Sequence, residues 1–273
     1  MISPLACGAH SRQCPPTARS RTTPWPAALR SSVRSPSTVW GELTLDNTKK
    51  AGGGSGIGLG IATRLGLHGT KVVIMGRRKD FLERAAVALR QQGITIATFA
   101  GDVRSEDDAR KAVGLAVREF GKLDTLVNCA AGNFLSLAEN LTTKGFTTVM
   151  EIDAIGTFNM CRQSLDALRD SKQGVIINIS ATLHYSTTWY QTHACAAKAA
   201  IDSMTRQLAL EWGAFNIRVN GVAPGPIDGT PGFVKLTGAD KNFQGQMQQH
   251  MVPLGRLGTV TDVVRSSSSV AVR

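Results

Sequence analysis

The sequence lacks several features that would place it in whole classes of protein. No stretch approaches the ~18 consecutive apolar residues of a membrane-spanning helix, so we expect no membrane span. The five cysteines are scattered and include no Cys-x-x-Cys pair, which argues against a disulfide scaffold and a cysteine zinc site. No His, Asp or Glu cluster has metal-ligand spacing, and we expect no metal. The net charge is +11, but no basic helix or aromatic-interleaved basic strip points to nucleic acid.

Acidic residues are missing from the first 41 positions, which carry five arginines and several prolines. The first acidic residue is Glu42. This composition cannot form a packed core, and it resembles an organellar transit segment. A wrongly assigned start of the chain would produce the same composition. We therefore predict a disordered or transit-like segment over residues 1–41 and a single folded domain over residues 42–273.

From residue 52 onward, apolar runs alternate with amphipathic stretches. The runs typical of buried strands are 72–75, 94–99, 125–128, 175–179 and 217–223. The stretches that predict helices are 59–67, 81–91, 106–120, 147–168 and 193–212. Ser105 followed by Asp108 predicts a capped start for the third of these helices. Continuous apolar strands between helices indicate an α/β fold, a Rossmann-type doubly wound parallel sheet covered on both faces.

A glycine-rich loop, Ala51-Gly52-Gly53-Gly54-Ser55-Gly56-Ile57-Gly58, opens the first predicted helix. Its glycines would let the backbone approach a pyrophosphate at a helix N-terminus. The predicted cofactor contacts in this loop are Gly52, Ser55, Gly56, Ile57 and Gly58. The strand that should precede the loop is degraded, because Lys49 and Lys50 would place unpaired charge in a buried sheet. Either Thr38–Leu45 supplies a shifted, poorer strand, or the first strand is absent.

The residues after the second and third strands select the cofactor. Arg77 and Arg78 follow the second strand, where an acidic residue would favour NAD and where arginine matches a 2′-phosphate. A solvated basic turn is the alternative interpretation. Asp102 and Val103 close the third strand, where a carboxylate can accept from an adenine amine. We therefore predict NADP(H) as the cofactor.

In order along the chain, these motifs resemble the short-chain dehydrogenase/reductase family. The resemblance covers about residues 52 to 262 and rests on the glycine loop, Asp102, the segment 128–132, Lys198 and the segment 224–227. It implies further cofactor contacts at Asn128, Ala130, Lys198, Pro224, Gly225 and Ile227.

Three longer segments resemble the peroxisomal 2,4-dienoyl-CoA reductases within that family. They are NCAAGNFL (128–135), VMEIDAIGTFN (149–159) and NIRVNGVAPGPIDGT (216–230). The usual catalytic Tyr, Ser and Asn positions hold Ala194, Ala181 and Asp153, as the narrower resemblance leads one to expect. It implies NADPH-dependent reduction of a 2,4-dienoyl-CoA to a 3-enoyl-CoA in the β-oxidation of unsaturated fatty acids. The alternatives are another short-chain reductase acting on a carbonyl, with Tyr185 or Tyr190 as proton donor, and a truncated non-catalytic remnant.

The resemblance also assigns roles within the site. Asp153 and Lys198 would hold and polarise a water that protonates the α carbon of the thioester. Asn133, with backbone amides, would stabilise the thioester oxyanion. His184 and His193 fall near the site, and we interpret both as satisfied structural histidines. The implied coenzyme A contacts are Arg77, Arg104, Phe134, Thr142, Thr143, Lys144 and Lys235, although Thr142 also suits a helix N-cap and Lys235 a solvated loop. Residues 228–250 fit a substrate-covering loop.

The last residues depart from the family pattern, which continues past Asp262 through another helix and a final strand. We therefore expect a C-terminally truncated domain that lacks the last strand. No Ser-Lys-Leu-type signal ends the sequence. The family resemblance implies a peroxisomal location, and the Arg- and Ser-rich N-terminus suggests a mitochondrion or plastid instead. The family resemblance also implies a homo-oligomer, a tetramer, with the stretches 147–168 and 193–212 at subunit contacts.

Overall fold

A computed structural model describes residues 38–42, 56–237 and 252–271 of the chain. The chain divides into two units, Met1–Arg34 and Ser35–Arg273, and every described residue belongs to the second. No helix in these ranges is long and apolar enough to cross a membrane.

The centre of the unit is one parallel sheet of six strands in the order β3-β2-β1-β4-β5-β6. The strands are β1 (Thr38–Glu42), β2 (Lys71–Gly76), β3 (Ile96–Ala100), β4 (Thr125–Asn128), β5 (Val175–Ile179) and β6 (Arg218–Val222). The order reverses between β1 and β4, as in a doubly wound nucleotide-binding sheet. The predicted fold class is confirmed, and each predicted apolar run forms one strand.

The first strand comes from the upstream stretch that the sequence left as one of two possibilities. β1 pairs in parallel with β2 on one side and with β4 on the other, so that Trp40 is in register with Val73 and Leu126. Lys49 and Lys50 lie outside the described residues. Because Thr38 starts a strand, the folded unit reaches back into the segment 1–41 that composition set apart. A strand of five residues is too short to stand out in that Ser- and Arg-rich segment.

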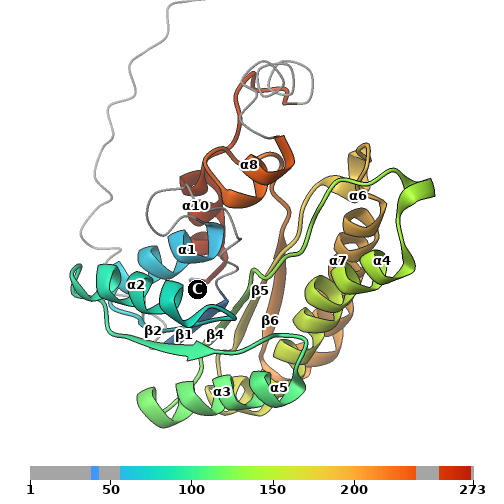
Figure 1. The fold of residues 1–273 in the computed structure, drawn as a ribbon. Coiled ribbons are helices and arrows are strands. Elements are labelled where there is room, and N and C mark those ends of the chain that lie inside the picture. The colour runs from blue at the N-terminus through green and yellow to red at the C-terminus, as the bar shows by residue number, and fades with distance from the viewer. Residues whose placement is uncertain (1–37, 43–55, 238–251, 272–273) are drawn as a thin grey trace, which may run out of the picture. The chain divides into compact units, whose positions relative to one another are not determined.

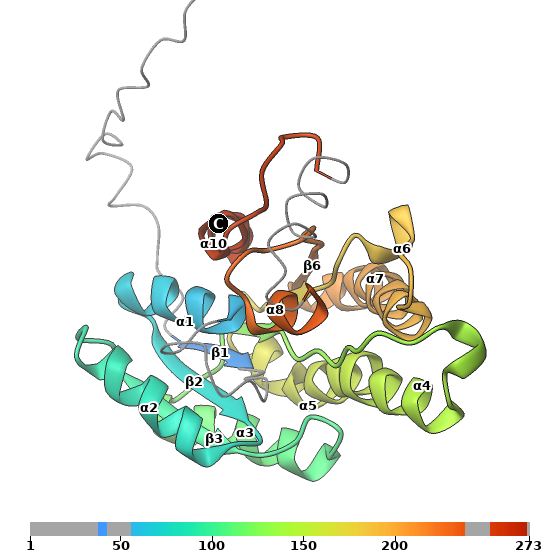
Figure 2. The same ribbon diagram turned by 45° about the horizontal axis from the view of Figure 1, so that its top comes forward.

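Helices cover both faces of the sheet, as Figures 1 and 2 show. One layer holds α1 (Ile57–Leu67), α2 (Lys79–Arg90) and α10 (Val260–Ala271). The other holds α3 (Glu106–Phe120), α5 (Gly156–Asp170) and α7 (Thr192–Trp212). Along β2, Val72 and Ile74 face the first layer, and Val73 and Met75 face the second. All four side chains are fully buried, because a strand covered on both faces has no polar side.

The predicted helix over 147–168 is three elements in the structure. α4 (Thr143–Met150) begins earlier, after Thr142, whose hydroxyl accepts from the Gly145 N–H at 3.1 Å. A π-helical turn, η3 (Glu151–Ile155), then leads into α5. Apolar periodicity alone does not distinguish a π turn from α-helix, so the sequence showed one continuous stretch. Such turns are rare and are often found at functional sites.

After β6 the described residues form helices rather than another strand. These are α8 (Pro231–Thr237) and α10. In α10, Val263, Val264 and Ser267 are buried at helical spacing, so the serine-rich segment still has an inward face. Residues 226–228 bridge to Gly258 before α10, with the Asp228 N–H donating to the Gly258 carbonyl at 2.8 Å. The expectation of a truncated domain without its last strand stays a prediction.

Candidate active site

The residues singled out in the sequence gather at the carboxyl ends of the strands. Arg77 and Arg78 follow β2, Asp102 follows β3, and the segment 129–134 follows β4. Lys198 comes from α7 and contacts the last residue of β5, and Pro224 follows β6. In an open parallel sheet, ligands bind outside these ends at the point where the strand order reverses.

Asp153 and Lys198 form a buried ion pair at the centre of this edge. The Asp153 Oδ2 lies 3.0 Å from the Lys198 Nζ, and the side chains are 1% and 7% exposed. The other oxygen of Asp153 accepts from the Gly132 N–H at 2.6 Å. Lys198 also donates to the Ile179 carbonyl at 3.3 Å. An ammonium has three N–H bonds, and these two acceptors use two of them.

The backbone around the pair is fixed from several directions. Asp153 lies in the π turn η3, and the Gly132 N–H that it accepts belongs to the segment after β4. Two strands are linked by side-chain hydrogen bonds to α7, the helix of Lys198. Asn178 on β5 donates to Thr205 of α7 at 2.8 Å, and Asn128 on β4 donates to Asn178 at 2.8 Å. These buried contacts join two strands to the helix that carries Lys198.

Burial controls the electrostatics of the pair. It raises the pKa of Asp153 above its ordinary value, while Lys198, the Gly132 N–H and His193 act in the opposite direction. A carboxyl group with a raised pKa beside an ammonium can retain or release a proton closer to neutral pH than an exposed aspartate. The arrangement therefore suits proton transfer through a bound water.

Asn133 lies next to the pair, but its amide already has partners. The Asn133 Nδ2 donates to Gln191, and its Oδ1 accepts from the Phe134 N–H at 2.8 Å. Gln191 is buried, and sequence reasoning did not find it. Its only signal was a polar residue just before the helix that carries Lys198. The same two segments are joined again where the Ser136 N–H donates to the Tyr190 carbonyl at 2.9 Å.

Phe134 stacks on His193, with ring centroids 4.2 Å apart. His193 is fully buried, and it packs on the Phe134 ring beside the Phe134 backbone. The interpretation of His193 as a satisfied structural histidine stays a prediction. Desolvation lowers the pKa of His193, against the opposing influence of the Phe134 backbone and of Asp153.

The other candidate proton donors lie away from the buried pair. Tyr185 is 63% exposed, and its hydroxyl donates to Asp202 on α7. His184, in the short helix α6 (Leu183–Ser186), lies 3.1 Å from the same carboxylate. Tyr190 is half exposed and has a φ of 65°, in the left-handed region that side chains other than glycine seldom adopt. No contact joins either tyrosine to Lys198 in the described residues.

The predicted cofactor contacts are only partly within the described chain. Gly52 and Ser55 lie outside it, whereas Gly56, Ile57 and Gly58 form the start of α1. Apart from its neighbours in the chain, none of the described residues lies within 4 Å of the place that a Cβ on Gly56 would occupy. Ala130 is buried, and the buried Oδ1 of Asn128 has no hydrogen-bond partner in the described part. The Asn128 Oδ1 without a described partner, the glycine-bearing start of α1, and the two arginines after β2 together fit a dinucleotide with a phosphate.

The segment after β6 carries Pro224, Gly225 and Ile227. The Thr182 N–H donates to the Pro224 carbonyl at 3.2 Å, so the segment is held beside the residues that follow β5. Ile227 is buried and bridged to Gly258. These contacts leave the three predicted cofactor residues at the same edge of the sheet as Lys198.

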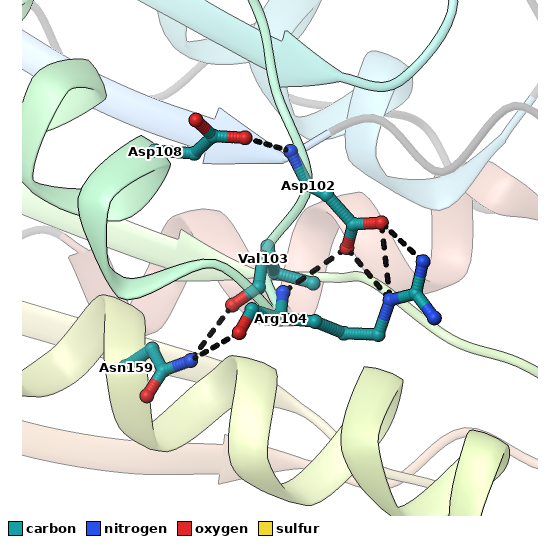
Figure 3. A network of polar contacts seen from close by, with 5 residues as sticks. All are labelled: Asp102, Val103, Arg104, Asp108 and Asn159. Carbon is teal, nitrogen blue, oxygen red and sulfur yellow. Dashed lines mark hydrogen bonds and ion pairs between the residues drawn. The ribbon is translucent and has the colours of Figure 1, made fainter.

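Asp102 and Arg104 form a contact that the sequence did not predict (Figure 3). The Arg104 Nη2 lies 2.6 Å from the Asp102 Oδ2, and the two side chains are partly exposed. This pairing lowers the pKa of Asp102 and raises that of Arg104. The sequence assigned Asp102 to the cofactor and Arg104 to coenzyme A, whereas in the structure the two side chains form an ion pair with each other.

The two arginines after β2 differ in their surroundings. The Arg78 guanidinium lies 3.8 Å from the centre of the Phe81 ring, and Arg77 is exposed.

The remaining predicted coenzyme A contacts lie on two helices. Thr142 caps α4, and Thr143 and Lys144 are exposed in its first turn. Lys235 lies in α8, but its side chain is outside the described part. Most of the expected covering loop, residues 238–250, also lies outside it.

Comparison with known proteins gives consistent matches. The family model described as short chain dehydrogenase matches residues 51–240. The peroxisomal 2,4-dienoyl-CoA reductase, (3E)-enoyl-CoA-producing, of Arabidopsis thaliana is 50% identical over 241 residues, 85% of this chain and 78% of that protein. A crystal structure of a short chain dehydrogenase from Bacillus anthracis is 37% identical, with a TM-score of 0.75 over 86% of this chain and 89% of the other. A variant actinorhodin polyketide ketoreductase with NADPH is 25% identical, with a TM-score of 0.76 over 86% and 90%.

Proposed function

This chain belongs to the short-chain dehydrogenase family, and from that premise we propose that it reduces 2,4-dienoyl-CoA to 3-enoyl-CoA. The observation that carries the proposal is the buried pair of Asp153 and Lys198, together with Ala194 at the position of the family's usual tyrosine. A carbonyl reductase needs a proton donor at the carbonyl oxygen, and Ala194 cannot be one. A conjugated dienoyl thioester instead needs its proton at the α carbon.

Each turnover adds one hydride and one proton to the substrate. NADPH, when bound, would supply the hydride for the distal carbon of the diene. Lys198 and Asp153 together orient a water and deliver the proton to the α carbon through it. Both side chains are almost fully buried, so their charges are poorly screened where the negative charge develops. Asn133 and nearby backbone amides act on the thioester oxygen, and Gln191 orients the Asn133 amide.

The choice of NADP(H) over NAD(H) rests on the residues after β2. Arg77 and Arg78 occupy the place where an acidic residue would bind the ribose hydroxyls. Arg77 also helps to lower the pKa of Asp102, so its positive charge acts at the predicted adenine site. Guanidinium groups suit a 2′-phosphate because they donate several hydrogen bonds to its oxygens.

For the acyl-CoA, we propose contacts to Arg77, Arg104, Phe134, Thr142, Thr143, Lys144 and Lys235. Thr143 and Lys144 are exposed at the N-terminal turn of α4, where N–H groups and a lysine favour a phosphate. Phe134 stacks on His193, whose charge influences Asp153, so Phe134 lies on the same side of the site as the buried pair. It would line the path of the acyl chain.

The proposal is tested by NADPH oxidation, measured with the full chain and a short 2,4-dienoyl-CoA. Wild-type protein should turn over, and Asp153→Asn should lose at least a hundredfold in kcat, in line with the usual contribution of a general acid. The variant should keep its NADPH affinity, because Asp153 acts on the substrate's proton. Asp202→Asn is the matched control, since Asp202 lies one turn after Lys198 on α7 and contacts Tyr185 and His184 instead of Lys198. Turnover retained in Asp153→Asn would contradict the role, and turnover of simple ketones lost at Tyr185 or Tyr190 would favour a carbonyl reductase.

We further propose a peroxisomal location and a homo-oligomer, both in line with the relatives and the family. The named relative from Arabidopsis thaliana is peroxisomal. On the outer face of η3 and α5, Ile155 and Phe158 are 48% and 49% exposed, and on α7 Leu210 is 78% exposed. The family resemblance places subunit contacts on the stretches 147–168 and 193–212, and these three exposed side chains lie within them. Imaging of the full chain with a fluorescent tag, beside a peroxisomal marker, tests the location.

A further inference from the structure

Both carboxylate oxygens of Asp102 accept hydrogen bonds from Arg104 in the structure. Its Oδ1 accepts from the Arg104 backbone N–H at 3.0 Å and from the Arg104 Nε at 3.1 Å. Its Oδ2 accepts from the same Nε at 3.0 Å and from the Arg104 Nη2 at 2.6 Å. A carboxylate offers about four lone-pair sites, and Arg104 alone directs three N–H groups at them, with its Nε–H shared between the two oxygens. The adenine amine proposed for Asp102 therefore competes directly with the Arg104 side chain.

The backbone that carries the two residues is held still, so only their side chains can move (Figure 3). The Asp102 N–H donates to Asp108 of α3 at 2.9 Å. From α5, Asn159 donates to the Val103 carbonyl at 3.0 Å and to the Arg104 carbonyl at 3.3 Å. Val103 is buried between them. Exchange of partners at Asp102 therefore needs no movement of a strand or helix.

The side chains are placed so that exchange is inexpensive. Arg104 and Asp102 are 38% and 24% exposed at their side chains, so water can replace part of their mutual hydrogen bonding when the pair separates. Glu151, two residues before Asp153, also favours the charged guanidinium of Arg104. A released Arg104 thus remains electrostatically attracted toward the turn that carries the catalytic aspartate.

We propose that the Asp102–Arg104 pair couples the cofactor site to the coenzyme A site. Arg104 leaves the carboxylate when the adenine amine binds to Asp102, and the freed guanidinium then binds a phosphate of coenzyme A. In the reverse direction, coenzyme A draws Arg104 away and frees Asp102 for the cofactor. Each ligand therefore raises the affinity for the other by the same factor, as linkage requires. The inference rests on the proposed function, since it takes both a dinucleotide and a coenzyme A thioester as ligands.

The direct test is NADPH binding, followed by its fluorescence, with and without saturating free coenzyme A. In the wild-type chain, coenzyme A should lower the Kd for NADPH about two- to fivefold, the range that a weak exposed ion pair supplies. In Arg104→Ala, NADPH alone should bind as tightly as it does to wild type with coenzyme A, and coenzyme A should then have no effect. Arg110→Ala is the matched control, because Arg110 makes an exposed pair with Asp107 on α3 and should behave as wild type.

The mirror variant is Asp102→Asn, measured with coenzyme A as the ligand. Removing the carboxylate frees Arg104, so coenzyme A alone should bind this variant as tightly as it binds wild type in the presence of NADPH. Coupling that persists in Arg104→Ala, or wild-type protein that binds the two ligands independently or does not bind coenzyme A, would overturn the proposal. Turnover is not used here, so a chain that shows coupling but does not reduce a dienoyl-CoA would contradict the proposed function alone.

Discussion

At the residue scale, the site depends on one carboxylate that is buried beside one ammonium. Moving a charge into a protein interior is costly unless it is paired and hydrogen-bonded. Asp153 meets both conditions, through Lys198 and the Gly132 N–H, yet burial still raises its pKa. Asp102 is the contrasting case, because it is partly exposed and Arg104 lowers its pKa. At one edge of the sheet, Asp153 therefore favours its protonated form more than an ordinary aspartate does, and Asp102 favours its ionised form, which accepts hydrogen bonds.

The pH dependence of turnover follows from the direction of the Asp153 shift. A raised pKa means that the folded protein keeps this proton to higher pH than a free aspartate does. Because the proton is consumed in each turnover, kcat should be highest below the raised pKa of Asp153 and should fall as pH rises through it. The measurement is kcat for NADPH oxidation against pH, with the NADPH Kd at each pH as control. A kcat that rises with pH over the same window would contradict the role of the pair.

At the scale of elements, α10 packs closely against α1, the helix whose first turn carries the predicted cofactor contacts. A Cβ on Gly60 of α1 would come 2.5 Å from the Val260 Cγ1 and 3.0 Å from the Val264 Cγ2. The glycine therefore permits the contact, and valine side chains have little rotamer freedom with which to move aside. The contact keeps α10 over the β5 side of the sheet, where Val264 and Ala271 join the apolar cluster.

Gly60→Ala should destabilise the protein by about 1–3 kcal/mol, the usual cost of overpacking a core contact. Gly114→Ala on α3 is the matched control. Nothing lies within 4 Å of the added Cβ there, so the change should be neutral or stabilising by up to about 1 kcal/mol. Adding Val260→Ala to Gly60→Ala should recover part of the loss. Urea denaturation measures the free energy of unfolding of wild type, Gly114→Ala, Gly60→Ala, Val260→Ala and the double variant. Strictly additive effects of the Gly60 and Val260 changes would show that the contact is not the cause.

At the scale of the whole molecule, the helix layers on the two faces of the sheet contribute different residues to the candidate site. The layer with α1, α2 and α10 covers the side of Val72 and Ile74, and its helix α1 begins at the cofactor loop. The layer with α3, α5 and α7 supplies Asn159 and Lys198 to the site and leaves Phe158 and Leu210 exposed. The second layer is therefore both the side that carries the proposed catalytic lysine and the candidate subunit surface.

Phe158→Asp should reduce the mass of the assembly, because a charge in an apolar subunit contact is costly to bury. Light scattering after size-exclusion chromatography measures the mass. Leu67→Asp is the control, since Leu67 at the end of α1 is 56% exposed and belongs to the other layer. An unchanged mass in Phe158→Asp, or an equal loss in Leu67→Asp, would contradict the assignment of the surface.

The sequence by itself determined the class of fold and most of its elements. Apolar runs and amphipathic stretches are local properties of the chain, so they predicted β2 to β6 and the helices α1, α2, α3, α5 and α7. Ser105 caps α3 as expected, accepting from the Asp108 N–H at 3.1 Å. Resemblance to a family then brought Asp153 and Lys198 together before any geometry was known. The position of β1 stayed open, because a five-residue strand in a composition-biased segment has no clear pattern.

Only the tertiary structure decided which polar groups meet, since those contacts join residues far apart in the chain. Gln191 reaches Asn133 over 58 positions, and Gly132 donates to Asp153 over 21. Burial decided the direction of the Asp153 shift, which depends on the packed environment rather than on the residue type. Geometry also decided that Arg104, two residues after Asp102, turns back onto its carboxylate. Side-chain orientation of that kind depends on the backbone fixed by Asp108 and Asn159, and no local pattern encodes it.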